Sequence, residues 1–303
     1  MKQITKVYMP IILSFLLFFC SNPELKKDNK TDDTEIKSFQ KNPEFNNYWY
    51  SGKAEITSYK LSQIRYGEIH EGTAVNIFVT EDFLPKKQVK ADKANKNNVP
   101  ILKLNSTKKF TTGIYPYSLM TSTFSPIEIN KNAIKISFSS QEWCGNTFVQ
   151  LNNREAYQIQ FYSYFESNAD KKINLKKHIL ENELWNQLRI SPKNLPVGEL
   201  QIIPSFEFLS LNHKEFKAFS AIASLEEQGA FLIYTINYPK LDRTLSIKVT
   251  KDFPNTIESW EETFSSRGKI LTTKAEKITT IQSAYWSKNG VADIKERKEL
   301  GLD

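Results

Sequence analysis

The chain has 303 residues, a formal net charge of +7, and 40% hydrophobic and 13% aromatic residues. This composition is typical of a globular protein with a sizeable core and excludes a disordered or fibrous chain. The one dense basic cluster, residues 84–98, has no aromatic residue between Phe83 and Phe110. Nucleic-acid surfaces combine basic residues with aromatic ones, so we expect no nucleic-acid partner.

The amino terminus has the pattern of an export signal. A short basic leader, Met1–Lys6, is followed by a mainly apolar run from Val7 to Phe19. A membrane-spanning helix needs about 20 apolar residues, and this run is shorter and contains Pro10. We therefore predict a signal peptide over residues 1–19 that directs the protein out of the cytoplasm.

The apolar run ends directly at Cys20, in the stretch LLFFCSN. It resembles a bacterial lipoprotein signal, in which the cysteine thiol is acylated and the cysteine becomes the new amino terminus. Leu17 stands at the usual leucine position, whereas Phe19 replaces the usual small residue. Two or more acyl chains make a stable anchor, so we predict lipid attachment at Cys20, with membrane lipid as a partner and the cell envelope as the location. An uncleaved or differently cleaved signal, or a cytoplasmic protein, are the alternatives.

Residues 20–47 are rich in charged and polar side chains and poor in apolar ones. Such a segment buries too little apolar surface to offset the entropy of ordering. We predict a flexible tether over residues 20–47, in which Asp32 and Asp33 are solvated rather than metal ligands, and a β-rich globular body over residues 48–303. No metal site and no cofactor are predicted.

Alternation of apolar and polar residues dominates this body. This pattern, with short Gly, Pro, Asn or Asp turns, predicts a mainly β (α+β) fold built on a large antiparallel curved sheet or half-barrel. The expected strands lie within residues 54–65, 68–83, 99–110, 113–126, 132–143, 155–167, 207–224, 229–238, 243–253 and 268–286.

One helix is predicted, over residues 173–190, where apolar residues recur at helical spacing. Asn174 is its expected cap, and Ser191-Pro192 its expected end. The sequence Val-Thr-x-Asp-Phe occurs in NIFVTEDFLP (76–85) and again in SIKVTKDFPN (246–255). This repeat is consistent with a duplicated fold, in which residues 48–170 and 195–286 form two similar sheets around the helix. A common turn at the end of a strand explains both occurrences without duplication.

Residue patterns of known catalytic sites are nearly absent. The sequence has no nucleophile elbow, phosphate loop, His-Glu-x-x-His or Cys-x-x-Cys. Cys144 is expected to be a buried structural residue, and His178 is expected on the surface of the predicted helix. The strongest acidic cluster is ESWEETF, where carboxylates near Trp260 are weak candidates for glycosidic hydrolysis: Glu258, Glu261 and Glu262.

Several runs resemble a family of exported lipoproteins found in Bacteroidota: YWYSGKAEITSY, GTAVNIFVTEDFLP, QEWCGNTF, ENELW and TIESWEETF. Some members of that family carry the name septum formation inhibitor Maf. The Ser-Pro-Arg-Arg segment of true Maf proteins is missing here, so that name does not transfer. The resemblance covers most of residues 48–303 and implies a lipoprotein to which no catalytic residue can be assigned.

The sequence therefore leaves two classes of function. The first is a non-catalytic, membrane-anchored envelope protein. It is either a module that binds an apolar or lipidic ligand on a concave sheet lined with Phe and Tyr, or a scaffold that contacts envelope proteins through a sheet edge. The alternative is an envelope hydrolase that uses the carboxylates near Trp260.

Overall fold

The computed structural model describes residues 42–302. The predicted signal peptide and Cys20 therefore lie outside the described residues. The strands are β1 (Ala54–Arg65), β2 (Glu68–Leu84), β3 (Val89–Lys90), β4 (Val99–Thr112), β5 (Tyr115–Pro126), β6 (Lys135–Glu142), β7 (Gly145–Asn153), β8 (Tyr157–Ser163), β9 (Lys171–Leu175), β10 (Ile179–Leu180), β11 (Gly198–Ile203), β12 (Phe219–Gln228), β13 (Phe231–Tyr238), β14 (Arg243–Thr250), β15 (Ile257–Ser266) and β16 (Lys269–Ser283). The helices are α2 (Pro43–Trp49), α3 (Glu181–Ile190), α4 (Phe206–Leu211) and α5 (Ile294–Glu299), with 3-10 turns η1 (Glu166–Asn168), η2 (Pro192–Asn194), η3 (Pro239–Leu241), η4 (Tyr285–Ser287) and η5 (Val291–Asp293).

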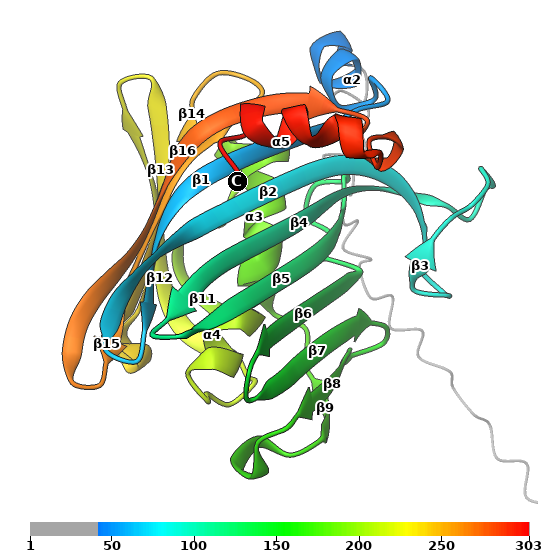
Figure 1. Ribbon diagram of the computed structural model, residues 1–303. Helices are drawn as coiled ribbons and strands as arrows, with labels where there is room; N and C mark the ends of the chain where they lie inside the picture. Colours follow the sequence, from blue (N-terminus) through cyan, green and yellow to red (C-terminus); the bar gives the residue numbers. More distant parts are fainter. Residues whose placement is uncertain (1–41, 303) are drawn as a thin grey trace, which may run out of the picture.

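The prediction of a mainly β fold with a large curved antiparallel sheet is confirmed (Figure 1). The strands form one sheet in the order β10-β11-β12-β13-β14-β15-β16-β1-β2-β4-β5-β6-β7-β8-β9, with β3 added beside β2. Neighbours run antiparallel, except that β10 and β11 are parallel. Because most neighbours are also consecutive in sequence, short hairpins build nearly the whole sheet.

The alternative of two similar sheets is wrong, because the strands form one sheet. β16 pairs with β1, so the two predicted halves are parts of one continuous sheet. The repeated Val-Thr-x-Asp-Phe sequence does not mark equivalent positions either. Its first copy lies inside β2, whereas its second begins at the end of β14 and continues into the turn after Thr250.

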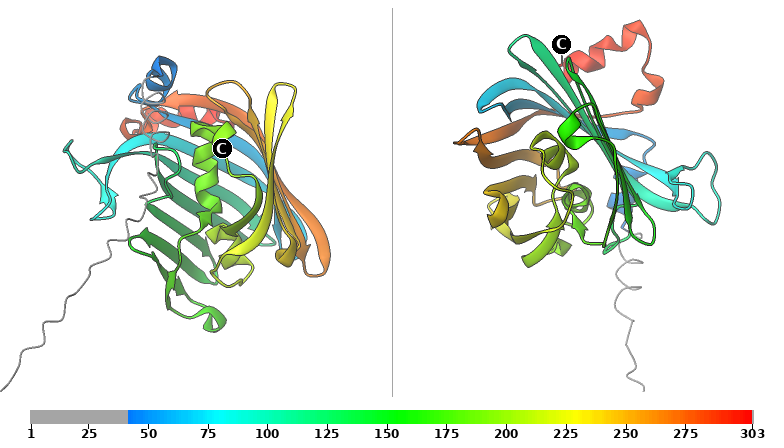
Figure 2. Two further views of the ribbon diagram at one scale, coloured as in Figure 1. Left: turned by 180° about the vertical axis from the view of Figure 1, so that it is seen from behind. Right: turned by 90° about the horizontal axis from the view of Figure 1, so that it is seen from below.

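The sheet curls until its two edges approach each other. β9 and β10 lie at opposite edges of the sheet, yet only residues 176–178 connect them. Consecutive Cα atoms are about 3.8 Å apart, so this connection spans at most about 15 Å. The curled but open sheet encloses α3, as the two views of Figure 2 show.

The predicted central helix begins later than expected. Residues 171–175 form β9, which pairs with β8, so the sheet contact overrides the helical spacing of this segment. Asn174 is therefore not a cap, and His178 lies between β9 and β10 rather than on the helix. Helix α3 starts at Glu181, and Glu183 accepts a hydrogen bond from the Leu180 N–H group at 3.0 Å. The predicted end is confirmed, because α3 stops at Ile190 before Ser191.

Three helices were not expected from the alternating pattern. Residues 207–211, predicted as part of a strand, belong to α4, because the Ser205 side chain accepts a hydrogen bond from the Phe208 N–H group and caps the helix. Residues 43–49 form α2, whose Phe45 and Trp49 are buried. The globular body therefore begins before residue 48. Helix α5 follows β16 on the outer face of the sheet (Figure 1).

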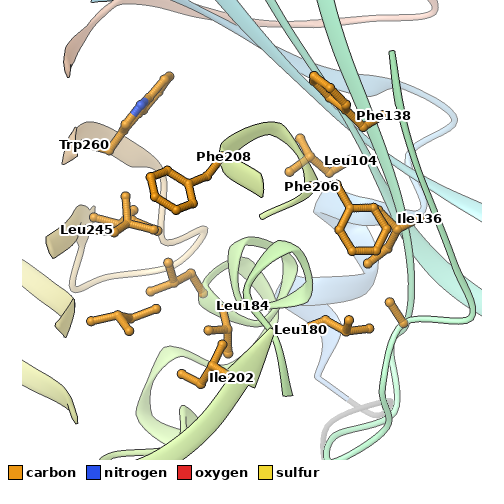
Figure 3. Close-up of a cluster of buried hydrophobic side chains, with 14 of the residues drawn as sticks. Leu104, Ile136, Phe138, Leu180, Leu184, Ile202, Phe206, Phe208, Leu245 and Trp260 are labelled. Carbon is orange, nitrogen blue, oxygen red and sulfur yellow. The ribbon is translucent and has the colours of Figure 1, made fainter. Parts of the chain in front are cut away.

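The core lies between the inner face of the sheet and helices α3 and α4 (Figure 3). Phe206 and Phe208 of α4 and Leu184 of α3 fill the interior that the curl encloses. Strand aromatics that the sequence suggested as the lining of a ligand cavity are fully buried members of this core, among them Tyr59, Phe78, Phe138, Tyr157 and Tyr234. Removal of these rings from water is a main source of stability.

A buried ion pair ties the end of α3 to β1. The guanidinium of Arg189 contacts both carboxylate oxygens of Glu55, with Nη2 to Oε2 at 2.6 Å, and both side chains are 0% exposed. The same guanidinium lies over the rings of Trp49 and Phe78. Burial alone would raise the pKa of Glu55, but Arg189 holds it below its ordinary value, so both groups are charged at neutral pH.

We expect Arg189→Met to lower the free energy of unfolding by about 3–5 kcal/mol, because it leaves the Glu55 carboxylate buried and unpaired. Urea unfolding measures this loss. The double variant Glu55→Gln/Arg189→Met should lose less than the sum of the two single variants. Lys274→Met is the control, since its exposed pair with Glu261 contributes at most about 1 kcal/mol.

The pH dependence gives a second check. Because the folded-state pKa of Glu55 is lowered, the contribution of the pair is complete above the unfolded value of about 4.5 and is lost as the pH falls through the folded value. Losses that add in the double variant, or wild-type and Glu55→Gln stabilities that change in parallel below pH 4.5, would contradict this role.

Candidate functional site

The three candidate carboxylates lie on β15 but do not form one site. Glu258 pairs with Lys277, and Glu261 pairs with Lys274 at 2.9 Å on the exposed side. Glu262 points into the interior, where its carboxylate accepts a hydrogen bond from Arg243 Nε at 2.6 Å. Neighbouring residues of a strand face opposite sides of the sheet, so Glu261 and Glu262 are separated by the sheet itself.

Arg243, at the start of β14, is the centre of an interior charge network. Its Nη1 and Nη2 donate to the two Glu181 oxygens at 2.6 and 2.7 Å, and its Nε donates to Glu262. The Tyr238 hydroxyl also donates to Glu181 at 2.6 Å. Burial alone would raise the pKa of Glu181, but Arg243 holds it below its ordinary value. Glu262 is therefore held in a structural network by Arg243.

A small interior pocket of about 50 Å³ lies beside this network. It has room for a few water molecules. Its other charges are also paired, since Lys108 Nζ lies 2.6 Å from the Glu207 carboxylate. The lining residues are Leu104, Ser106, Lys108, Thr121, Thr123, Glu181, Asn182, Trp185, Ser205, Glu207, Arg243, Leu245, Trp260 and Glu262.

Cys144 lies in the exposed turn between β6 and β7, so the prediction that it is buried is wrong. The neighbouring Trp143 is 68% exposed. A hydrogen bond to Glu142 raises the pKa of the Cys144 thiol, which disfavours the thiolate that a nucleophile needs. Over residues 42–302, no cluster of three or more His, Cys, Asp and Glu side chains is arranged to hold a metal ion.

The larger cavity lies at the end of the sheet where the β1–β2 and β6–β7 hairpins turn. We call this cavity, of about 220 Å³, the mouth cavity. Its wall comes from the ends of strands on one side and from α4 and the β8–β9 connection on the other. The lining residues are Arg65, Tyr66, Tyr117, Ser140, Glu142, Gly145, Thr147, Phe165, Asn168, Ser210, Leu211 and His213.

Arg65 is the strongest electrostatic feature of the mouth cavity. Its Nη1 donates to the Leu211 carbonyl oxygen at 2.7 Å, and its guanidinium lies over the Tyr66 ring at 4.3 Å. The Tyr66 and Tyr117 hydroxyls share a hydrogen bond of 2.7 Å beside it. In the described part of the chain, no carboxylate forms an ion pair with Arg65. Its Nε and Nη2 make longer contacts, of 3.4 Å, with these tyrosine hydroxyls, so the partners of Arg65 in this part of the chain are uncharged.

The backbone at Tyr66 is unusual for this residue type. Tyr66 and Gly67 form the two-residue β1–β2 turn with φ of 55° and 79°. Turns with positive φ at both positions strongly favour Asn-Gly, and a bulky residue in this conformation costs about 1–2 kcal/mol. The guanidinium of Arg267, from the neighbouring β15–β16 turn, lies 5.0 Å from the Tyr66 ring. These contacts hold the tyrosine at the cavity.

Polar groups complete the opposite wall. Asn168 Nδ2 lies within hydrogen-bond distance of His213 Nδ1. Burial and the nearby Arg65 lower the pKa of His213, so its imidazole is neutral at pH 7. Ser210 is only 7% exposed, and its Oγ has no hydrogen-bond partner in the described residues. A buried hydroxyl without a hydrogen bond costs free energy. A hydrogen bond to a ligand or to a water molecule in the cavity would remove this cost.

Sequence analysis did not identify the mouth cavity, because its lining residues come from six separate segments. The one available signal was the Tyr-Gly pair between two strongly alternating strands, which marks a hairpin with an uncommon first turn residue. No segment taken alone indicates that residues near 65, 142 and 213 meet.

Comparison with known proteins gives little further information. No family model matches the chain, and no curated protein matches it. Among solved structures, one match is the crystal structure of a beta-barrel-like protein of the domain of unknown function DUF1849 from Brucella abortus. It has 8% sequence identity, covers 76% of this chain and 98% of that chain, and gives a TM-score of 0.48. This likeness is too slight to support an argument about activity.

We expect Glu262→Gln to lower the free energy of unfolding by about 1–3 kcal/mol, because it weakens a buried, charge-assisted hydrogen bond to Arg243. The adjacent Glu261→Gln should change it by less than about 0.5 kcal/mol, since Glu261 is exposed. Urea unfolding of the two variants makes this comparison. Equal effects at the two positions would contradict the assignment of Glu262 to the interior network.

Proposed function

We propose that the protein is a non-catalytic binding module of the cell envelope, held on a membrane by acylated Cys20. Its ligand is a small molecule that occupies the mouth cavity. The observation that supports this proposal best is Arg65, a guanidinium that has no carboxylate partner within residues 42–302 and lines a cavity of about 220 Å³ together with several hydroxyl groups. Convergent polar groups in a concave site are the usual mark of a ligand pocket.

The mouth cavity favours a small polar ligand over the apolar or lipidic ligand expected from the sequence. The strand aromatics that suggested a lipid cavity pack against one another in the core. The cavity is also smaller than the roughly 300–1,000 Å³ of sites for drug-sized ligands. A lipid would therefore have to place only its polar end there.

Export and anchoring are inferred from the first 20 residues and from the resemblance to exported lipoproteins. No helix within residues 42–302 is long and apolar enough to cross a bilayer. A scaffold role through an exposed sheet edge remains a separate proposal, for which β9 offers the edge. The carboxylates of β15 offer little support for the hydrolase alternative, because each has its own cationic partner.

We expect Cys20→Ala to move the protein from the membrane fraction to the soluble fraction, because it removes the acylated thiol. Fractionation and mass spectrometry of the mature amino terminus measure this effect. Cys144→Ala is the control, since Cys144 is the other cysteine of the chain. Cys20→Ala protein that remains in the membrane fraction would contradict the anchor.

We expect the full-length protein to purify with a small polar molecule, and Arg65→Gln to retain at most a tenth of it. Solvent extraction and mass spectrometry give the amount per protein chain. Arg154→Gln is the matched control, because Arg154 is exposed and contacts the Lys86 carbonyl oxygen away from the mouth cavity. Tyr66→Phe, which keeps the ring and removes the hydroxyl, gives a second test if Arg65→Gln does not fold.

A stoichiometric lipid that is retained equally by wild type and Arg65→Gln would contradict the proposed site. So would a polar molecule whose amount does not depend on Arg65.

A further inference from the structure

Two opposite charges line the mouth cavity. Arg65 comes from the end of β1 and Glu142 from the end of β6. Glu142 accepts a hydrogen bond from the Cys144 N–H group at 2.6 Å. Neither side chain forms an ion pair in the part of the chain that the structure describes. The cavity thus has one cationic and one anionic group in its wall.

His213 is the other side chain of the lining whose charge could change near neutral pH. Its pKa is lowered, first by burial and then by Arg65, so it adds no charge at pH 7. The charges of the lining therefore sum to zero. A simple anion would be attracted by Arg65 and repelled by Glu142, so the two effects oppose each other and the cavity is not selective for anions.

The uncharged part of the lining matches a small molecule with hydrogen-bonding groups. The Ser210 hydroxyl is buried and unpaired in the described residues. The Tyr66 and Tyr117 hydroxyls use one proton in their mutual hydrogen bond, which leaves the other O–H group as a donor. Phe165 and Leu211 add apolar contacts.

We propose that the mouth cavity binds a small zwitterion, a free amino acid or a short peptide, with its carboxylate at Arg65 and its ammonium group at Glu142. This inference rests on the proposed function and names the ligand class of the same site. A guanidinium is well suited to carboxylates because its planar donors match the two oxygens. The ligand's own opposite charges would pair with this guanidinium and this carboxylate, neither of which forms an ion pair within residues 42–302.

Isothermal titration of the full-length protein in detergent with glycine, L-alanyl-L-alanine and trialanine tests the proposal. At pH 6.5 the amino group of each peptide is charged, because an α-amino pKa is about 7.7–8.0. We expect at least one of the three to bind with one-to-one stoichiometry. Its N-acetyl derivative and its carboxyl-terminal amide should each bind at least tenfold more weakly to the wild-type protein.

Variants assign the two charges. Glu142→Gln should equalise the affinities for the free and N-acetylated ligands, whereas Arg65→Gln should equalise those for the free and amidated ligands. Arg154→Gln should leave every affinity unchanged. The comparison of derivatives uses the wild-type protein, so a variant that does not fold leaves the test intact.

Failure of all three zwitterions to bind, or equal binding of free and N-acetylated ligands, would overturn the zwitterion inference. If a co-purifying molecule still depends on Arg65 in that case, the binding function stands and its ligand belongs to another class. If no molecule depends on Arg65, the proposed function fails as well.

Discussion

The connection of residues 176–178 constrains the whole structure. It joins β9 and β10, the two outermost strands of a sixteen-stranded sheet, across at most about 15 Å. Such a sheet cannot remain flat when its edges are linked so closely. It must curl, and the curl creates an interior with two walls, β12 to β15 on one side and β4 to β8 on the other. Helix α3 directly follows β10, so the same connection places it where the interior has to be filled.

The charged residues of α3 determine how it fills that interior. Arg189, near its end, pairs with Glu55 of β1, and Glu181, at its start, pairs with Arg243 of β14. Removal of these ions from water is costly, so the pairs add little net stability, but an arrangement that separates them is strongly disfavoured. They thereby fix the rotation and the height of α3 against both walls. The fixed helix and α4 leave unfilled space mainly at the hairpin end, where the mouth cavity lies.

Much of the sheet was predictable from the sequence, since period-two alternation and turn residues depend on local chain geometry. The start of α3 was not, because residues 171–175 satisfy the helical spacing and become a strand only by pairing with β8. For α4, a single capping serine outweighed the alternating pattern. The carboxylates near Trp260 looked like a cluster because they are close in sequence, whereas the sheet divides them between its two faces. The curl of the sheet, and with it the mouth cavity, depends on contacts between segments up to about 150 residues apart.

The turn residues at the mouth cavity differ in type from those of an ordinary two-residue hairpin. Tyr66 and Arg267 both adopt positive φ in two-residue turns where Asn would be less strained. Each is followed by glycine, and the two side chains stack on each other at the same end of the sheet. His213, on the opposite wall, also has positive φ. Positions where local preference is violated without benefit to the core are typical of functional sites. Tyr66 and His213 line the mouth cavity, and Arg267 holds Tyr66 there, so three of the seven non-glycine residues with positive φ in residues 42–302 belong to this one cavity.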